Sequence, residues 1–180
     1  GWTYGETANK PAAEAKFGKV TFIMDEAVDA GTYTVKAVVE ATANYTGLEA
    51  EVEYTIAKAD NEVTLNVSNW TYGETAQMPT ATSKAGTVTI VITDAAGKEV
   101  TEVTEAGTYT VKATASETTN YTSASAEKTF TVAQATNEWT TELNIEGWTY
   151  GETANKPAAE AKFGKVTFIM DEAVDAGTYT

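Results

Sequence analysis

The sequence predicts an all-β protein in which antiparallel β-sandwich modules follow one another along the chain. Apolar residues alternate with polar ones along several segments rich in Val, Thr and Tyr, which is typical of strands. The pentapeptide WTYGE occurs three times, at 2–6, 70–74 and 148–152. Residues 147–180 repeat residues 1–34 without a single change. The motif spacings of 68 and 78 residues are too long for solenoid repeats and fit small domains instead.

The composition narrows the classes of function. The chain of 180 residues, 42% of them hydrophobic, can fill one to three small cores. It contains no Cys and no His, which excludes disulfides, thiol nucleophiles and the usual zinc sites, and we expect no cofactor. The net charge of −14 disfavours nucleic acid and anionic membranes as partners. No apolar run approaches the roughly 20 residues that membrane insertion requires.

The first module, residues 1–58, begins at WTYGE and continues as three alternating segments. Val20, Phe22 and Met24 share one face of the first segment, so that segment is predicted to be a strand. The segment 12–19, AAEAKFGK, is the best candidate for a helical turn, but it is too short to stand alone. The predicted strands span 19–24, 33–39 and 52–56.

The middle module, residues 59–134, is complete, because it also has a leading strand before WTYGE. It contains eight more residues than the first module in the region around Gly97, and we interpret them as an additional hairpin. An insertion of this kind lies at a surface edge, where its backbone polar groups stay solvated. The predicted strands span 61–67, 86–93, 98–103, 107–115 and 128–132.

The third module, residues 135–180, has a leading strand at 137–145 and runs out at Thr180 inside a strand. The first module lacks a leading strand and the third lacks its last two, so only the middle one is complete. Incomplete sheets leave open edges, and we expect the ends of neighbouring molecules to meet head to tail by strand addition or exchange. The linkers at 57–60 and 133–136 contain neither Gly nor Pro, which favours a stiff array of neighbouring modules over free hinging.

A repeated Gly-Thr-Tyr sequence sharpens the predicted fold. Tyr33 and Tyr109 each follow a Gly by two residues and lead an alternating strand. In immunoglobulin-like sandwiches, a Tyr at this place bonds back to the preceding corner through its hydroxyl, and we predict such a tyrosine corner at both positions. The position two residues later, a Cys in antibody domains, is Val35 and Val111 here, so packing replaces the disulfide.

The chain resembles the MBG-type repeats of bacterial surface proteins, which are tandem immunoglobulin-like modules. The resemblance rests on a Tyr-Gly pair, a Gly-Thr-Tyr triplet, an Asn-Tyr pair and a closing segment. These lie at 4–5, 31–33, 44–45 and 56–59 in the first module, and at 72–73, 107–109, 120–121 and 132–135 in the middle one. In the middle module the closing segment has Gln134 where the first has Lys58. The resemblance implies a fold and an extracellular or cell-surface location in a bacterium, but no catalytic residues.

The aromatic residues of WTYGE have two interpretations. They could stack on the sugar rings of a host glycan, or they could fix a turn and lie partly buried at a joint between modules. The motif stands beside a linker in every module, which favours the second interpretation. The candidate residues are Trp2, Tyr4, Trp70, Tyr72, Trp148 and Tyr150.

No metal site or catalytic site is predicted. Two acidic groups could contribute oxygen ligands to Ca²⁺, but no D-x-D-x-D-G loop is present, and solvated loops are the preferred interpretation. They are Asp25, Glu26 and Asp29 in one group, and Asp94 with Glu99 in the other. The chain lacks His, Cys and a G-x-S-x-G motif, and its carboxylates show no pairing, so we do not expect an enzyme.

These observations favour a structural role. The expected function is that of a stalk or spacer of a large bacterial surface or secreted protein, since long internal identity indicates recent duplication and tolerance of copy number. The alternative is an adhesive module that recognises a host glycan or protein through WTYGE or through the hairpin near Gly97.

Overall fold

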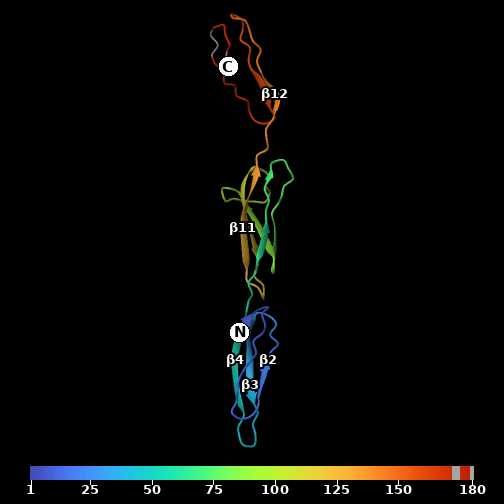
Figure 1. Cartoon of the computed structure of the whole chain (residues 1–180), viewed down its shortest axis with the longest axis vertical. Coiled ribbons are helices and arrows are strands. Elements are labelled where there is room, and N and C mark those ends of the chain that lie inside the picture. The colour runs from blue at the N-terminus through green and yellow to red at the C-terminus, as the bar shows by residue number, and fades with distance from the viewer. Residues whose placement is uncertain (172–174, 179–180) are drawn as a thin grey trace. The chain divides into compact units, whose positions relative to one another are not determined.

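The computed structural model describes residues 1–171 and 175–178 of the chain, and this part is all-β (Figure 1). The chain divides into two compact units, Gly1–Ala133 and Gln134–Thr180. No helix occurs in the described ranges, and the candidate turn at 12–19 contains a bend at 16–18 and otherwise no regular structure. Within the same ranges, no helical segment is available that could cross a membrane.

The first module forms one four-stranded sheet. Strands β2 (Val20–Met24), β3 (Gly31–Val39) and β4 (Leu48–Ala57) are antiparallel neighbours, and β1 (Trp2–Thr3) runs parallel to β4 at the edge. The strands β2, β3 and β4 contain the segments predicted from alternation. The buried hydrophobic side chains of this module, Val35, Val39 and Ile56, lie along β3 and β4.

The middle module has a five-stranded sheet and a two-stranded one. The larger sheet has the order β6-β11-β10-β8-β9. The smaller sheet pairs β5 with β7 and packs on β10 and β11, so that a core is enclosed between two layers. The strands are β5 (Val63–Asn66), β6 (Trp70–Thr71), β7 (Thr80–Ser83), β8 (Val88–Thr93), β9 (Glu99–Val100), β10 (Gly107–Ala115) and β11 (Ala124–Ala133).

The buried core of the middle module comes from five of its strands. Val111 and Ala113 on β10 are fully buried, and Phe130 on β11 is 2% exposed. The predicted additional hairpin is confirmed, because β8 pairs with β9 around a turn at Gly97. The core cluster contains Leu65, Trp70, Ile92, Tyr109, Val111, Ala113, Phe130 and Val132.

The second unit contains one antiparallel pair, β12 (Trp139–Asn144) with β13 (Ala158–Ala161). Strand β12 confirms the leading strand predicted at 137–145. Residues 134–171 and 175–178 contribute no buried hydrophobic side chain. The segment 166–170 has the sequence of β2 but forms no strand here. The end of the strand expected to run out at Thr180 lies outside the described residues.

Candidate functional site: the joint between the first and middle modules

In the first and middle modules, the Trp of WTYGE ends a column of three aromatic rings. In the middle module, Trp70 stacks on Phe130 with ring centroids 5.1 Å apart, and Tyr109 stacks on the same Phe130 at 5.4 Å. In the first module, Tyr54 holds the central place, at 5.3 Å from Trp2 and 5.7 Å from Tyr33. Trp70 therefore belongs to the core of its module, while Trp2 makes the equivalent stack with half-buried rings.

Both predicted corner tyrosines bond back to the backbone. The Tyr33 hydroxyl donates to the Asp29 carbonyl at 2.9 Å, and the Tyr109 hydroxyl donates to the Glu105 carbonyl at 3.0 Å. Each bond spans four residues and holds the loop that enters the long central strand of its sheet. In the first module, this loop also contains Asp29 and Ala30, which bond to Asn120 of the middle module.

The remaining four residues of WTYGE build a tight turn. In the middle module, the Glu74 amide donates to the Thr71 carbonyl at 3.0 Å, and the Thr71 amide donates to the Glu74 carboxylate at 2.9 Å. Gly73 lies at φ +88°, as the third residue of a type II turn requires. The same pair of bonds recurs at Thr3 with Glu6 and at Thr149 with Glu152.

Replacing Gly73 by alanine should destabilise the middle module by about 1–2 kcal/mol, because an L side chain is strained in the left-handed region. Steric overlap does not cause this loss of stability, since a Cβ at Gly73 would meet no atom within 4 Å. Amide hydrogen exchange of β10 and β11 measures the free energy of unfolding of this module.

The matched control for this substitution is Gly107→Ala, in the same module. Gly107 is not in the left-handed region, and a Cβ there would make ordinary contact with the Tyr109 ring at 3.8 Å. We expect little change at Gly107. An equal loss of protection from both substitutions would contradict the strain explanation.

In the first and middle modules, WTYGE pairs with the end of the last strand of the module, β4 or β11, and therefore lies beside the linker. Trp2 pairs with Ile56, and the Tyr4 amide donates to the Ala57 carbonyl at 2.8 Å. The Tyr4 ring then meets the edge of the Tyr121 ring in the middle module, with centroids 5.6 Å apart. The motif thus takes part in a contact between consecutive modules.

Asn120 joins the two modules through both ends of its side-chain amide. Its Nδ2 donates to the Asp29 carboxylate at 2.8 Å, and its Oδ1 accepts from the Ala30 amide at 2.8 Å. These partners are separated by about 90 residues, and the Asn120 side chain is half-buried. Because the two bonds restrain the side chain at two points, they fix the direction of approach as well as the distance.

The linker itself is held by the same turn of the middle module. The Ala59 amide donates to the Asn120 carbonyl at 2.9 Å, and the Thr122 amide donates to the Ala59 carbonyl at 3.0 Å. Lys58 donates to the Thr118 carbonyl at 2.8 Å and forms an ion pair with Glu117. The linker is therefore part of a hydrogen-bonded bridge, which differs from a flexible tether.

Two of the acidic residues singled out in the sequence, Asp29 and Asp94, accept hydrogen bonds from other residues of the fold. The Asp29 carboxylate accepts from Asn120, and the Asp94 carboxylate accepts from the Ala96 and Lys98 amides at 2.9 Å each. Within the described ranges, no three acidic side chains gather in a way that could hold a metal ion.

One surface ion pair strengthens the sheet of the first module. The pKa of Lys36 is raised, because its ammonium donates to the Glu49 carboxylate at 2.8 Å and is attracted by that charge. The pair is present below the unfolded Lys pKa of about 10.4 and is lost as the pH rises through the raised value. Both side chains are exposed, so its contribution to stability is small.

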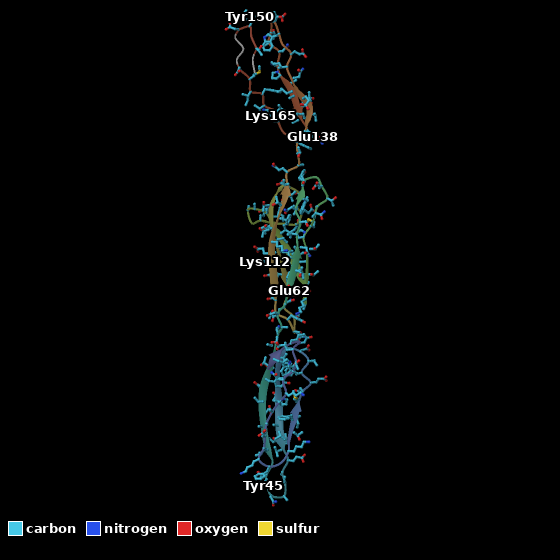
Figure 2. All side chains as sticks on the ribbon, viewed as in Figure 1. Tyr45, Glu62, Lys112, Glu138, Tyr150 and Lys165 are labelled. Atoms are coloured by element: carbon cyan, nitrogen blue, oxygen red, sulfur yellow. The ribbon has the colours of Figure 1, made fainter. Side chains whose placement is uncertain are left out.

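The predicted aromatic candidates differ in exposure. Trp70 is 8% exposed, and Trp2, Tyr4 and Trp148 are half-buried. Tyr72 and Tyr150 are the exposed members, at 54% and 73%; Figure 2 shows Tyr150 among the side chains. The structure brings Tyr4 into the joint with Tyr121.

Sequence reasoning missed the residues that make the joint. Asn120 was recognised only as part of an Asn-Tyr turn, Asp29 only as an acidic loop residue, and Lys58 only as part of the closing segment. Their positions beside a linker and a corner were visible in the sequence. Their pairing was not, because it joins segments far apart along the chain.

Comparison with known proteins yields no match among family models, curated proteins or solved structures. The resemblance to MBG-type repeats therefore stays a prediction.

Proposed function

We propose that this chain belongs to the non-catalytic stalk of a large bacterial surface or secreted protein, in which immunoglobulin-like modules repeat as spacers. The observation that supports the proposal is the joint between the first and middle modules. A spacer must hold its two ends at a defined distance and direction. A joint with fixed side-chain contacts meets this requirement because it keeps neighbouring modules in one orientation. The resemblance to MBG-type repeats supports the location and the immunoglobulin-like assignment.

The contacts of the joint act in complementary ways. The backbone bridge at Ala59 shortens the free length of the linker to almost nothing, so few conformations remain for bending. Asn120 and Lys58 attach the middle module to two separate segments of the first, which opposes rotation about the linker. The aromatic edge contact between Tyr4 and Tyr121 adds apolar packing beside these polar bonds.

The repeats provide the means to extend such a stalk. Residues 147–180 copy residues 1–34, and WTYGE forms the same turn in all three modules. A module whose corner and turn form locally can be duplicated without redesign of its neighbours. Length then changes with copy number, as a spacer requires.

Nuclear magnetic resonance of the full chain tests the proposal. Residual dipolar couplings from the first and middle modules should fit one common alignment tensor, because a fixed joint makes both modules tumble together. Amides of the β3–β4 and β10–β11 pairs give the two sets of couplings. Two different tensors of unequal magnitude would show free hinging and would contradict the spacer with a fixed joint.

The alternative function, adhesion to a host glycan or protein, is favoured by one observation, the exposure of Tyr72 and Tyr150. A glycan array probed with the full chain and with the Tyr72→Ala, Tyr150→Ala double variant tests it. Binding that the double variant loses would support adhesion. Equal signals from both chains would exclude these aromatic side chains as the adhesive site.

A further inference from the structure

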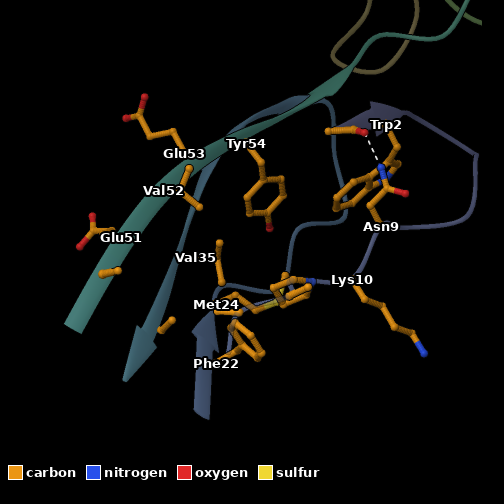
Figure 3. Close-up of a pocket in the computed structure, with 16 residues that line it drawn as sticks. Trp2, Asn9, Lys10, Phe22, Met24, Val35, Glu51, Val52, Glu53 and Tyr54 are labelled. Carbon is orange, nitrogen blue, oxygen red and sulfur yellow. Dashed lines mark hydrogen bonds between the residues drawn. The ribbon is translucent and has the colours of Figure 1, made fainter. Parts of the chain in front are cut away.

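An open groove lies against the sheet of the first module. Its volume is about 460 Å³, and apolar side chains from β1, β2, β3 and β4 contribute to its lining. Figure 3 shows Trp2, Tyr54, Val35, Met24 and Phe22 around it. The Tyr54 hydroxyl is buried and has no hydrogen-bond partner in the structure. The groove thus combines an apolar lining with an unused polar group.

In the middle module, a strand fills the corresponding place. Leu65 of β5 is 2% exposed and belongs to one core cluster with Trp70, Val111 and Phe130. These three residues match Trp2, Val35 and Tyr54 of the groove by their distances from the repeated motifs. The groove is therefore the seat of a leading strand that residues 1–58 do not supply.

The third module identifies the strand that fits this seat. Residues 158–161 have the same sequence as residues 12–15, and they pair with β12 as β13. In the first module, residues 12–15 pair with no strand. The same four-residue sequence thus forms a strand where the segment 137–145 lies beside it. It remains unpaired where no such segment is present.

Asn137 adds a second point of recognition at the start of the leading strand. Its side-chain amide donates to the Phe163 carbonyl at 2.7 Å and accepts from the Phe163 amide at 3.2 Å. Asn61 makes the same pair of bonds with Ala85 in the middle module, at 2.9 and 3.2 Å. The matching residue in the first module is Phe17, which these bonds do not reach.

Strand β12 gains little burial where it lies. All six of its residues are exposed, and Leu143, which matches Leu65 in its distance from the motif Trp, is 65% exposed. A two-stranded sheet is marginally stable by itself. The strand is therefore held weakly in its own unit, while a better-lined place for it exists on the first module.

We propose that the groove of the first module binds residues 137–145 of a second copy of this chain as an added strand. The backbone of the donor pairs with residues 12–15, Leu143 enters the groove and packs against the stacked rings of Trp2 and Tyr54, and Asn137 clamps the backbone of Phe17. Recognition by strand addition combines main-chain bonds with pockets for alternate side chains. The register follows that of β12 on β13.

Single cysteines test this register, because the natural chain has no cysteine. Thr141 lies opposite Glu160 in the β12–β13 pair, with both side chains exposed, and the residue equivalent to Glu160 is Glu14. A Thr141→Cys chain mixed with a Glu14→Cys chain should form a disulfide-linked heterodimer under mild oxidation. The control mixes Asn144→Cys with Glu14→Cys, because Asn144 pairs with Ala158, whose equivalent is Ala12, two residues along the strand from Glu14.

A labelled peptide with the sequence of residues 137–145 gives an independent measurement. Fluorescence anisotropy should show saturable binding to the full chain, and a Leu143→Asp peptide should bind at least about tenfold more weakly. Preferential crosslinking at 141 with 14, together with peptide binding, supports the proposal. Equal crosslinking in the control mixture, or no heterodimer, overturns the second copy as donor. Equal binding of both peptides overturns the groove as the site.

Discussion

Replacing Phe130 by alanine should unfold most of the middle module, lowering its free energy of unfolding by about 3–5 kcal/mol. Phe130 is 2% exposed and forms the centre of the column between Trp70 and Tyr109. Its removal leaves a cavity and deprives two further rings of their stacking partner. A domain of this size has a total stability of only about 4–11 kcal/mol, so the loss is a large fraction of it.

Amide hydrogen exchange locates this effect within the chain. Protection of β10 and β11 should fall by several orders of magnitude, while β3 and β4 of the first module serve as the internal reference. The matched control is Phe163→Ala, because the Phe163 side chain is 66% exposed and has no core to leave. Unchanged protection in β10 and β11 would show that Phe130 does not hold this core.

The Phe130→Ala substitution should also loosen the joint between the first and middle modules, because Phe130 lies on a strand of the sheet that positions Asn120. Phe130 lies on β11, whose partner β10 follows the corner at Glu105 and precedes the turn that carries Asn120. If the sheet opens, Asn120 loses its position relative to Asp29. The common alignment of the first and middle modules should therefore be lost in Phe130→Ala even though no residue of the joint has changed.

Alternation of apolar residues predicted the long strands and also β5 and β9, but it missed β1, β6, β7 and β13. In β3 and β10, every second side chain faces a core, which produces a clear signal over nine residues. Strand β7 has the sequence TATS, in which no large apolar side chain marks the buried face. Strands β1 and β6 have two residues each, and their parallel pairing depends on closing strands more than 50 residues away.

The copied segments show why sequence alone could not settle these elements. Residues 20–24 form β2 in the first module, where β3 lies beside them, but the identical residues 166–170 form no strand. Residues 158–161 form β13 beside β12, but the identical residues 12–15 remain unpaired. The turn of WTYGE, by contrast, forms in every copy, because its hydrogen bonds are local. Strand formation thus depends on a partner, and the partner is not encoded in the segment itself.

The joint illustrates the same limit for the candidate site. The sequence indicated a stiff connection, since the linker at 57–60 lacks Gly and Pro, and it marked the Asn-Tyr turn as a repeated feature. It could not indicate that Asn120 bonds to Asp29, because the two residues are 91 positions apart in the sequence. Both are small polar residues that belong to no periodic pattern. Tyr4 was among the predicted aromatic residues, but its partner Tyr121 was not.

The double substitution Lys58→Ala, Asn120→Ala should release the joint while both modules stay folded. Asn120 contributes two hydrogen bonds between the modules, each worth about 0.5–1.5 kcal/mol, and Lys58 contributes further bonds to Thr118 and Glu117. The loss of the two Asn120 bonds alone, about 1–3 kcal/mol, should reduce the ratio of closed to open joints by roughly 5- to 150-fold, and the loss of the Lys58 bonds adds to this. Residual dipolar couplings should then require separate alignment tensors for the two modules.

A matched control separates the joint from general destabilisation. Thr119→Ala changes an exposed residue of the same turn that is not one of the residues joining the two modules, so it should leave one common tensor. Protection of β3 and β10 should stay unchanged in both variants, because neither substitution reaches a core. If the double variant kept a common tensor, the linker backbone alone would fix the modules, and the bridge at Ala59 would become the element that sets stiffness. If it lost the common tensor, the side chains of Lys58 and Asn120 would be the elements that set the stiffness of this joint.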